Sequence, residues 1–184
     1  DFVDYLLEKR LRFSLNFYRG TQNVISDQFT PDNEELINRL FETYSRIEKI
    51  IPSYSMFSSI TDRANASFLH ARACGVGQNY LSILPNGKIT KCQMEQEISI
   101  TTIDDPDPLM TIVLDQSNPI NLSVNEKSCS KCVWRYRCSG GCSRLSESYF
   151  RSSSAVSPLC NVYQAILPKA IELEAMRLIK FKPP

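Results

Sequence analysis

The spacing of seven cysteines is the feature that most constrains this chain of 184 residues. The first half of the pattern is Cys74-x12-Gly87-x4-Cys92. The second half is a close run followed by one distant thiol: Cys129, Cys132, Cys138, Cys142 and Cys160. Short loops that carry two thiols, with partners far along the chain, are typical of sites for soft metals. Two sites of four thiolates need eight ligands, so either one cysteine is idle or one site has an open or non-cysteine position.

Charge and hydropathy exclude several classes of function. The formal net charge of +1 predicts neither a nucleic-acid partner nor a membrane-surface partner. No apolar run approaches the roughly 18 to 20 residues that cross a bilayer. An odd number of cysteines without a secretory signal fits a disulfide framework poorly. We therefore expect a cytoplasmic protein whose reduced thiols bind metal.

The first 52 residues predict a helix, a strand and a second helix. Residues 1–10 read as the end of an amphipathic helix, and the next segment alternates apolar with polar residues, which predicts a strand. Its apolar residues are Leu11, Phe13, Leu15 and Phe17, and its polar residues are Arg12, Ser14 and Asn16. The second helix is predicted to start with Thr30-Pro31-Asp32 and to stop at Pro52. A lone βα unit cannot bury both faces, so we expect the chain to be part of a longer protein.

The remaining segments predict an α+β fold. A short helix is expected near 58–68, and a β-hairpin over 80–91, because Asn86-Gly87 supplies the positive φ values of a tight turn. The hairpin would bring Cys74 and Cys92 together. Residues 99–128 are acidic and interrupted by prolines, which predicts a surface excursion, and residues 161–182 predict a helix that starts or kinks at Pro168.

The cysteine run itself is typical of iron–sulfur ligands. Cys129, Cys132 and Cys138 lie on one loop that can curl round a cluster, and Gly140-Gly141 lets the backbone approach it closely. Cys142, beyond that turn, is expected to point toward a second centre. Interleaved apolar residues could form a dry shell: Val133, Trp134 and Tyr136. Four of the cysteines could also form a structural zinc site, and that alternative stays open here.

Non-cysteine ligands have two interpretations each. His70 lies four residues before Cys74, so it is either a ligand, a donor behind a ligand, or a hydrogen-bonded packing residue. The acidic residues Asp104, Asp105 and Asp107 either complete a metal site or form an acidic surface loop.

The full pattern from Cys74 to Cys160 resembles the SPASM domain, the C-terminal extension of many radical SAM enzymes. Six spacings and one glycine agree at once, namely C-x12-G-x4-C, then C-x2-C-x5-C-x3-C, then a last cysteine. Residues 11–20 with the following helix are similar to the last βα unit of a radical SAM partial TIM-like barrel. Three shorter stretches resemble maturases that cross-link peptides into cyclophanes: 91–94, 134–138 and 157–160.

The resemblance implies two auxiliary [4Fe–4S] clusters. The outer cluster would be held by Cys129, Cys132, Cys138 and Cys160. The inner cluster, nearer the barrel, would be held by Cys74, Cys92 and Cys142. Some relatives supply a fourth inner ligand shortly after the first cysteine, but residues 75–80 contain none.

The resemblance also implies a division of the chain and a set of partners. Residues 1–70 would be the remnant of the barrel, with Arg12, Ser14 and Asn16 toward its cofactor cavity, and residues 71–184 the auxiliary domain. The CxxxCxxC motif of the SAM-cleaving cluster is absent, so S-adenosylmethionine and a third cluster would belong to a segment upstream, and the chain alone would be inactive. The implied partners are that barrel, a ribosomally made peptide substrate, and an electron donor such as ferredoxin or flavodoxin. The alternative function is a zinc-stabilised peptide-binding module.

Overall fold

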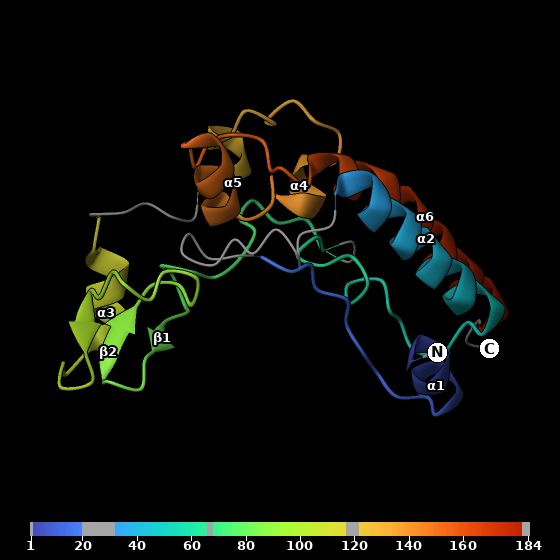
Figure 1. Cartoon of the computed structure of the whole chain (residues 1–184), viewed down its shortest axis with the longest axis horizontal. Helices are drawn as coiled ribbons and strands as arrows, with labels where there is room; N and C mark the ends of the chain where they lie inside the picture. The colour runs from blue at the N-terminus through green and yellow to red at the C-terminus, as the bar shows by residue number, and fades with distance from the viewer. Residues whose placement is uncertain (1, 20–31, 66–67, 117–121, 182–184) are drawn as a thin grey trace.

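The computed structural model describes residues 2–19, 32–65, 68–116 and 122–181, and it combines helices with a small antiparallel sheet. The expected α+β class is therefore confirmed. The sheet and α3 lie at one end of the molecule, α2 and α6 run side by side at the other, and α4 and α5 lie between them (Figure 1). The helices and strands are α1 (Phe2–Glu8), α2 (Asn33–Lys49), β1 (Ser82–Ile83), β2 (Lys88–Thr90), β3 (Thr101–Thr102), α3 (Pro108–Leu114), η2 (Val124–Glu126), α4 (Arg135–Cys138), α5 (Ser143–Phe150) and α6 (Cys160–Lys180).

Helix α2 forms as its apolar periodicity predicts, but with a different N-cap. Asp32 is the cap, and its carboxylate accepts a hydrogen bond from the Glu35 backbone N–H at 2.7 Å. Thr30 and Pro31, the predicted start, lie outside the described residues. The helix ends at Lys49, ahead of Pro52, and its buried face carries Leu40, Tyr44 and Ile47.

Helix α6 is continuous through Pro168, so the proline does not start the main helix. Its first residue is Cys160, which places a predicted ligand at the end of the longest packed element. Among the described residues, no helix is both long and apolar enough to cross a membrane. The buried residues of α6 face α2: Val162, Tyr163, Ile166, Leu167, Ala170 and Leu173.

The main core joins segments from both sides of residue 70. Leu7 of α1, Phe17 and the buried face of α2 pack with α6, and Trp134 and Cys138 of the cysteine-rich segment pack against the same cluster. The predicted domain division at residue 70 thus falls between segments that share one core. Burial of these apolar side chains fixes the ends of α4 and α6, where two of the cysteines lie.

The predicted strand over residues 11–17 is wrong, because the structure has no strand within residues 11–19. A strand needs a neighbour that completes its ladder, and here the backbone donates instead from Leu15 to the Ser59 carbonyl (2.7 Å) and from Phe17 to the Asp62 carboxylate (2.9 Å). The alternation of burial survives. Phe13, Leu15 and Phe17 pack toward the core, while the polar alternates are exposed: Arg12, Ser14 and Asn16.

The predicted short helix near 58–68 is also wrong for the described residues 58–65, which form turns. Asp62 has φ of +55°, a left-handed conformation that interrupts any α-helix at this point. The hydroxyl of Thr61 donates to the Ala64 carbonyl at 2.6 Å, which satisfies a buried acceptor locally. Residues 66 and 67 lie outside the described residues.

The predicted hairpin is confirmed, with a looser turn than expected. Gly87 has φ of +77°, whereas Asn86 has no positive φ. The Gly87 N–H donates to Leu84 O (3.0 Å) and the Leu84 N–H to Lys88 O (2.8 Å), so the loop has three residues and one left-handed glycine. Strand β3 pairs with the far side of β2, which gives the order β1-β2-β3.

The expected surface excursion over 99–128 is wrong in part, since it supplies β3, α3 and η2. Its acidic residues stabilise turns. The Asp107 carboxylate caps α3 by accepting from the Met110 N–H at 3.0 Å, and Asp105 accepts from the Thr101 hydroxyl at 2.6 Å. Ile112 and Val124 are fully buried, so parts of this segment belong to the interior.

The α2–α6 core yields a matched pair of substitutions on one helix. Leu167→Ala removes a fully buried side chain, and we expect it to lower the free energy of unfolding by about 2–5 kcal/mol. Leu178→Ala, at a position 49% exposed, should change it by less than about 0.5 kcal/mol. Urea denaturation followed by circular dichroism measures both values, and equal effects would contradict the packing described here.

Candidate metal centre

The four cysteines predicted for the outer cluster line one pocket. Its walls hold about 330 Å³ of space, part of it open to solvent. The thiols come from Cys129, Cys132, Cys138 and Cys160, and Trp134 and Tyr163 are among the other lining residues. Thiolate donors round one largely enclosed site fit a metal centre that prefers sulfur.

Three local structures bring these thiols together. Cys129 and Cys132 share a turn in which the Cys132 N–H donates to the Cys129 carbonyl at 2.9 Å. Cys138 is the last residue of α4, and Cys160 is the first residue of α6. The side chain of Gln164, one turn into α6, donates to the Cys160 sulfur at 3.5 Å. Each thiol therefore sits at the end of an element whose other residues are anchored in the core.

A left-handed turn separates Cys138 from Cys142. Ser139, Gly140 and Gly141 have φ values of +48°, +69° and +69°. A Cβ atom on Gly140 would lie 3.0 Å from the Cys129 sulfur and 2.6 Å from Cδ of Lys127. The turn thus passes so close to a ligand sulfur that only glycine fits, as the sequence predicted for close backbone approach.

The inner group of cysteines lies round the end of the hairpin. Cys92 is buried and packs with Val76, Cys74 and Met94 in a small second core. Burial raises the pKa of the Cys92 thiol, and the neighbouring Cys142 and Cys74 raise it further, against a lowering by the Met94 N–H. The hairpin therefore brings Cys74 and Cys92 together as predicted, with Cys142 beside them.

An ion pair joins the two sides of the inner group. Cys142 is the N-cap of α5, and Arg144 in its first turn pairs with Glu95 at 2.5 Å. The Glu95 N–H donates to the Cys92 carbonyl at 2.9 Å. Both charged side chains are only 12% exposed, so solvent screens the pair weakly.

The outer thiols are shielded from water. Burial raises the pKa of Cys138 to about 11, and it also raises the pKa values of Cys129 and Cys160. Thiols of this kind are protonated near neutral pH and lose their protons only on binding a metal. Within the described residues, no group of three or more His, Cys, Asp or Glu side chains is arranged to hold a single metal ion.

The predicted dry shell is partly wrong. Trp134 lines the outer pocket, but Val133 is 82% exposed and points away from it. The Tyr136 hydroxyl donates to Asn125 at 3.2 Å. The ring of Tyr163 takes the place that the sequence assigned to these residues.

The candidate extra ligands have different surroundings. The backbone of His70 is tied to the cysteine loop, because its N–H donates to Tyr136 O (3.0 Å) and its carbonyl accepts from the Ser139 hydroxyl (2.6 Å). Its Nε2 atom is buried and has no hydrogen-bond partner among the described residues. Asp105 and Asp107 are engaged in turns, and the Asp104 N–H donates to Thr102 (3.4 Å). His70 is therefore the better placed of the two alternatives.

Two functional features were missed by sequence reasoning. Lys127 is 3% exposed and its ammonium donates to the carbonyls of Ser139 (3.1 Å) and Gly141 (2.9 Å). Burial lowers the pKa of Lys127, whereas Cys129, Cys142, Cys138 and Cys74 raise it. The second feature is a buried network in which Arg19 pairs with Asp62, whose carboxylate accepts from the Tyr163 hydroxyl at 2.6 Å. No spacing or periodicity marks these residues.

The polar residues of segment 11–17 lie on the surface. Arg12 stacks over the ring of Tyr54 with 5.2 Å from its guanidinium carbon to the ring centroid, and the Asn16 amide donates to Ser14 at 3.1 Å. They are accessible, and none of them contacts the cysteine groups in these interactions.

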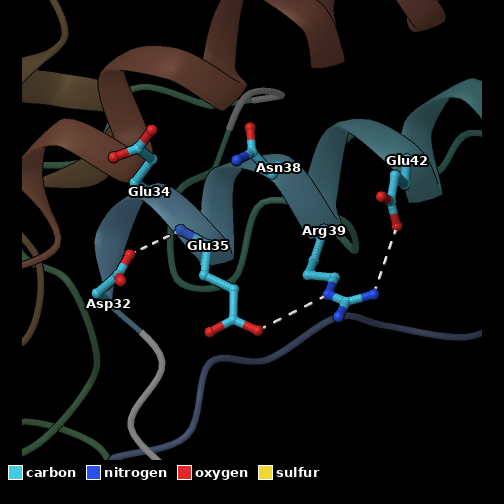
Figure 2. A pocket seen from close by; sticks show the side chains of 6 residues that line it. All are labelled: Asp32, Glu34, Glu35, Asn38, Arg39 and Glu42. Atoms are coloured by element: carbon cyan, nitrogen blue, oxygen red, sulfur yellow. Dashed lines mark hydrogen bonds and ion pairs between the residues drawn. The ribbon is translucent and has the colours of Figure 1, made fainter.

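Another pocket runs along one face of α2 (Figure 2) and carries no cysteine. The Arg39 guanidinium lies 3.9 Å from Glu35 and 3.7 Å from Glu42, and all three side chains are largely exposed. Charges on one solvated helix face contribute little energy, so we assign no site there. Its lining residues are Asp32, Glu34, Glu35, Asn38, Arg39 and Glu42.

Comparison of the chain with protein-family models, with curated proteins and with solved structures gives no match. The functional assignment therefore depends on the residues and their geometry.

The turn beside Cys129 can be tested with two glycines of similar conformation. Gly77 has φ of +75° and nothing within 4 Å of an added Cβ, so Gly77→Ala reports the left-handed strain alone, about 1–2 kcal/mol. Gly140→Ala adds the clash with Lys127 and Cys129, for which we expect at least about 1 kcal/mol more. Urea denaturation of both variants measures the difference, and equal losses would show that the turn can move aside.

Proposed function

We propose that this chain is the auxiliary iron–sulfur domain of a radical SAM enzyme that modifies a ribosomally synthesised peptide. The observation that carries the proposal is the outer pocket, where Cys129, Cys132, Cys138 and Cys160 line one site from three different elements. Sets of four thiolates on loops and element ends are the usual ligands of [4Fe–4S] clusters.

The inner cluster is assigned to Cys74, Cys92 and Cys142. Their proximity round the hairpin end supports this set, and the Arg144–Glu95 pair supports its rigidity. With three cysteines, the fourth iron position is open to an exogenous ligand or to a protein atom. The buried, unpartnered Nε2 of His70 makes this side chain the first protein candidate within the described residues.

Bound clusters would supply one-electron transfer to or from a substrate radical. The chain's own residues hold the thiols in place and keep water away. Trp134 and Tyr163 cover the outer pocket, and Tyr163 is fixed by its hydrogen bond to Asp62. Burial and the neighbouring Asp62 carboxylate raise the pKa of Tyr163 well above its ordinary value, so the phenol keeps its proton and the bond.

The barrel and its cofactor belong to the same proposal. Residues 1–70 would be the last part of a partial TIM-like barrel that adjoins the auxiliary domain, and the upstream part would carry S-adenosylmethionine on a third [4Fe–4S] cluster. The exposure of Arg12, Ser14 and Asn16 supports a surface that meets another part of the enzyme. A ferredoxin or flavodoxin would be the electron donor, in the cytoplasm.

The ligand partition can be tested by removing one cysteine from each group. Cys132→Ala should lose the outer cluster and keep the inner one, because Cys132 lines only the outer pocket. Cys92→Ala should do the reverse. Iron analysis and electron paramagnetic resonance of the reduced proteins measure this, with circular dichroism as the control for folding. Equal loss of both signals in each folded variant would contradict the partition.

The enzymatic role can be tested in a protein that carries both this chain and the SAM-cleaving barrel. Cys138→Ala should still release 5′-deoxyadenosine, since that reaction depends on the cluster of the barrel, but should make no modified peptide. Chromatography of both products from one reaction checks this on an iron-counted sample. A wild-type yield of modified peptide would reduce the outer centre to a structural role, as in a zinc-stabilised module.

A further inference from the structure

Lys127 is a buried cation without a carboxylate partner in the described part of the chain. Its side chain is 3% exposed, and the acceptors of its ammonium are two backbone carbonyls, of Ser139 and Gly141. Lys91, another buried lysine, has its charge balanced by Asp115 at 2.6 Å. A buried charge is costly unless an opposite charge compensates it, so Lys127 requires an anion of another kind.

The position of Lys127 is fixed from two sides. It ends the 3₁₀ turn η2, where the Ser123 N–H donates to Glu126 (2.7 Å) and the Asn125 N–H to Ser123 (3.4 Å). The Val124 N–H of the same turn donates to the Ala71 carbonyl at 2.7 Å, three residues before Cys74. The other side is the left-handed turn 139–141, whose carbonyls converge on the ammonium.

This position lies between the two cysteine groups. The turn that wraps the ammonium joins Cys138 of the outer group to Cys142 of the inner group. A Cβ on Gly140 would lie within 3.4 Å of the Lys127 Nζ and 3.0 Å of the Cys129 sulfur, so ammonium and thiol border the same small space. Glycine at 140 therefore lets the lysine pass directly beside an outer ligand.

An iron–sulfur core held by thiolates is anionic, and each electron that it accepts adds one negative charge. A fixed cation nearby therefore stabilises the reduced state more than the oxidised one, and the effect is strong where water is excluded. The thiolates are also the anions that Lys127 otherwise lacks.

We propose that Lys127 is the shared counter-ion of the two cysteine groups and raises the reduction potentials of both clusters. This inference rests on the function proposed above. Lys127 acts on the clusters through space, and its hydrogen bonds to the 139–141 turn position it for that role.

The test compares three variants of the whole chain, assembled with iron and sulfide without oxygen. Lys127→Met keeps the length of the side chain and removes the charge, whereas Lys127→Arg keeps the charge. Lys131→Met is the matched control, because Lys131 lies between Cys129 and Cys132 in sequence but is exposed to water. The measurement is a redox titration of each cluster followed by electron paramagnetic resonance, after iron is counted.

We expect Lys127→Met to lower the equilibrium constant for one-electron reduction of each cluster at least tenfold, which corresponds to about 59 mV. Lys131→Met should shift either potential by less than half of that. Unchanged potentials in an iron-loaded Lys127→Met protein would overturn the inference, and a shift confined to one cluster would contradict the shared role.

Failure to load iron is also decisive. If Lys127→Met takes up no clusters but Lys127→Arg takes up both with nearly wild-type potentials, the charge is what the site needs, as proposed. If both variants fail alike, the residue acts by packing and the inference is wrong. A wild-type chain without iron and sulfide would overturn the proposed function itself, whereas two clusters in the wild type with no effect of Lys127→Met would overturn only the role of this lysine.

Discussion

The close passage of the chain between Cys138 and Cys142 is the constraint on which the rest of the site depends. Three successive left-handed residues turn the backbone round the Lys127 ammonium, and Gly140 leaves room for both the lysine and the Cys129 sulfur. A side chain at 140 would push the loop off one group of thiols. The turn therefore allows two cysteine groups to lie on either side of one short peptide segment.

The helical core gives this turn a rigid base. Helix α6 packs along α2 and presents Cys160 at its start and Tyr163 one turn later. The Tyr163 hydroxyl reaches Asp62, which also pairs with Arg19, so the segment that follows residue 17 is tied to the wall of the outer pocket. Because Asp62 is fully buried, removing one member of this network would leave an uncompensated charge or donor beside the cysteines.

Local signals predicted the elements that depend on local signals. The apolar period gave α2 and α6, and Asn86-Gly87 gave the hairpin, since these patterns act within a few residues. Residues 11–17 have the alternation of a strand, yet strand formation needs a partner, and the described residues provide Ser59 and Asp62 in its place. The helix expected near 58–68 gives way to the left-handed Asp62, whose conformation is held by contacts distant in sequence.

The candidate site shows the same division. Cysteine spacing grouped the four thiols that line one pocket and the pair at the hairpin end, because short spacings limit how far ligands can separate. Lys127 and Asp62 were not predicted, since a single buried charge has no period or motif. Val133 was assigned to a dry shell from its apolar character alone, but the turn that precedes α4 directs it to solvent.

The central claim is that the thiols hold two iron–sulfur clusters rather than separate metal ions. Its most direct test is the metal and sulfide content of the chain assembled and purified without oxygen. The account predicts about eight irons and about eight acid-labile sulfides per chain, with the broad visible absorption of [4Fe–4S] centres. A colourless protein with about two zinc ions or fewer and negligible sulfide would contradict it.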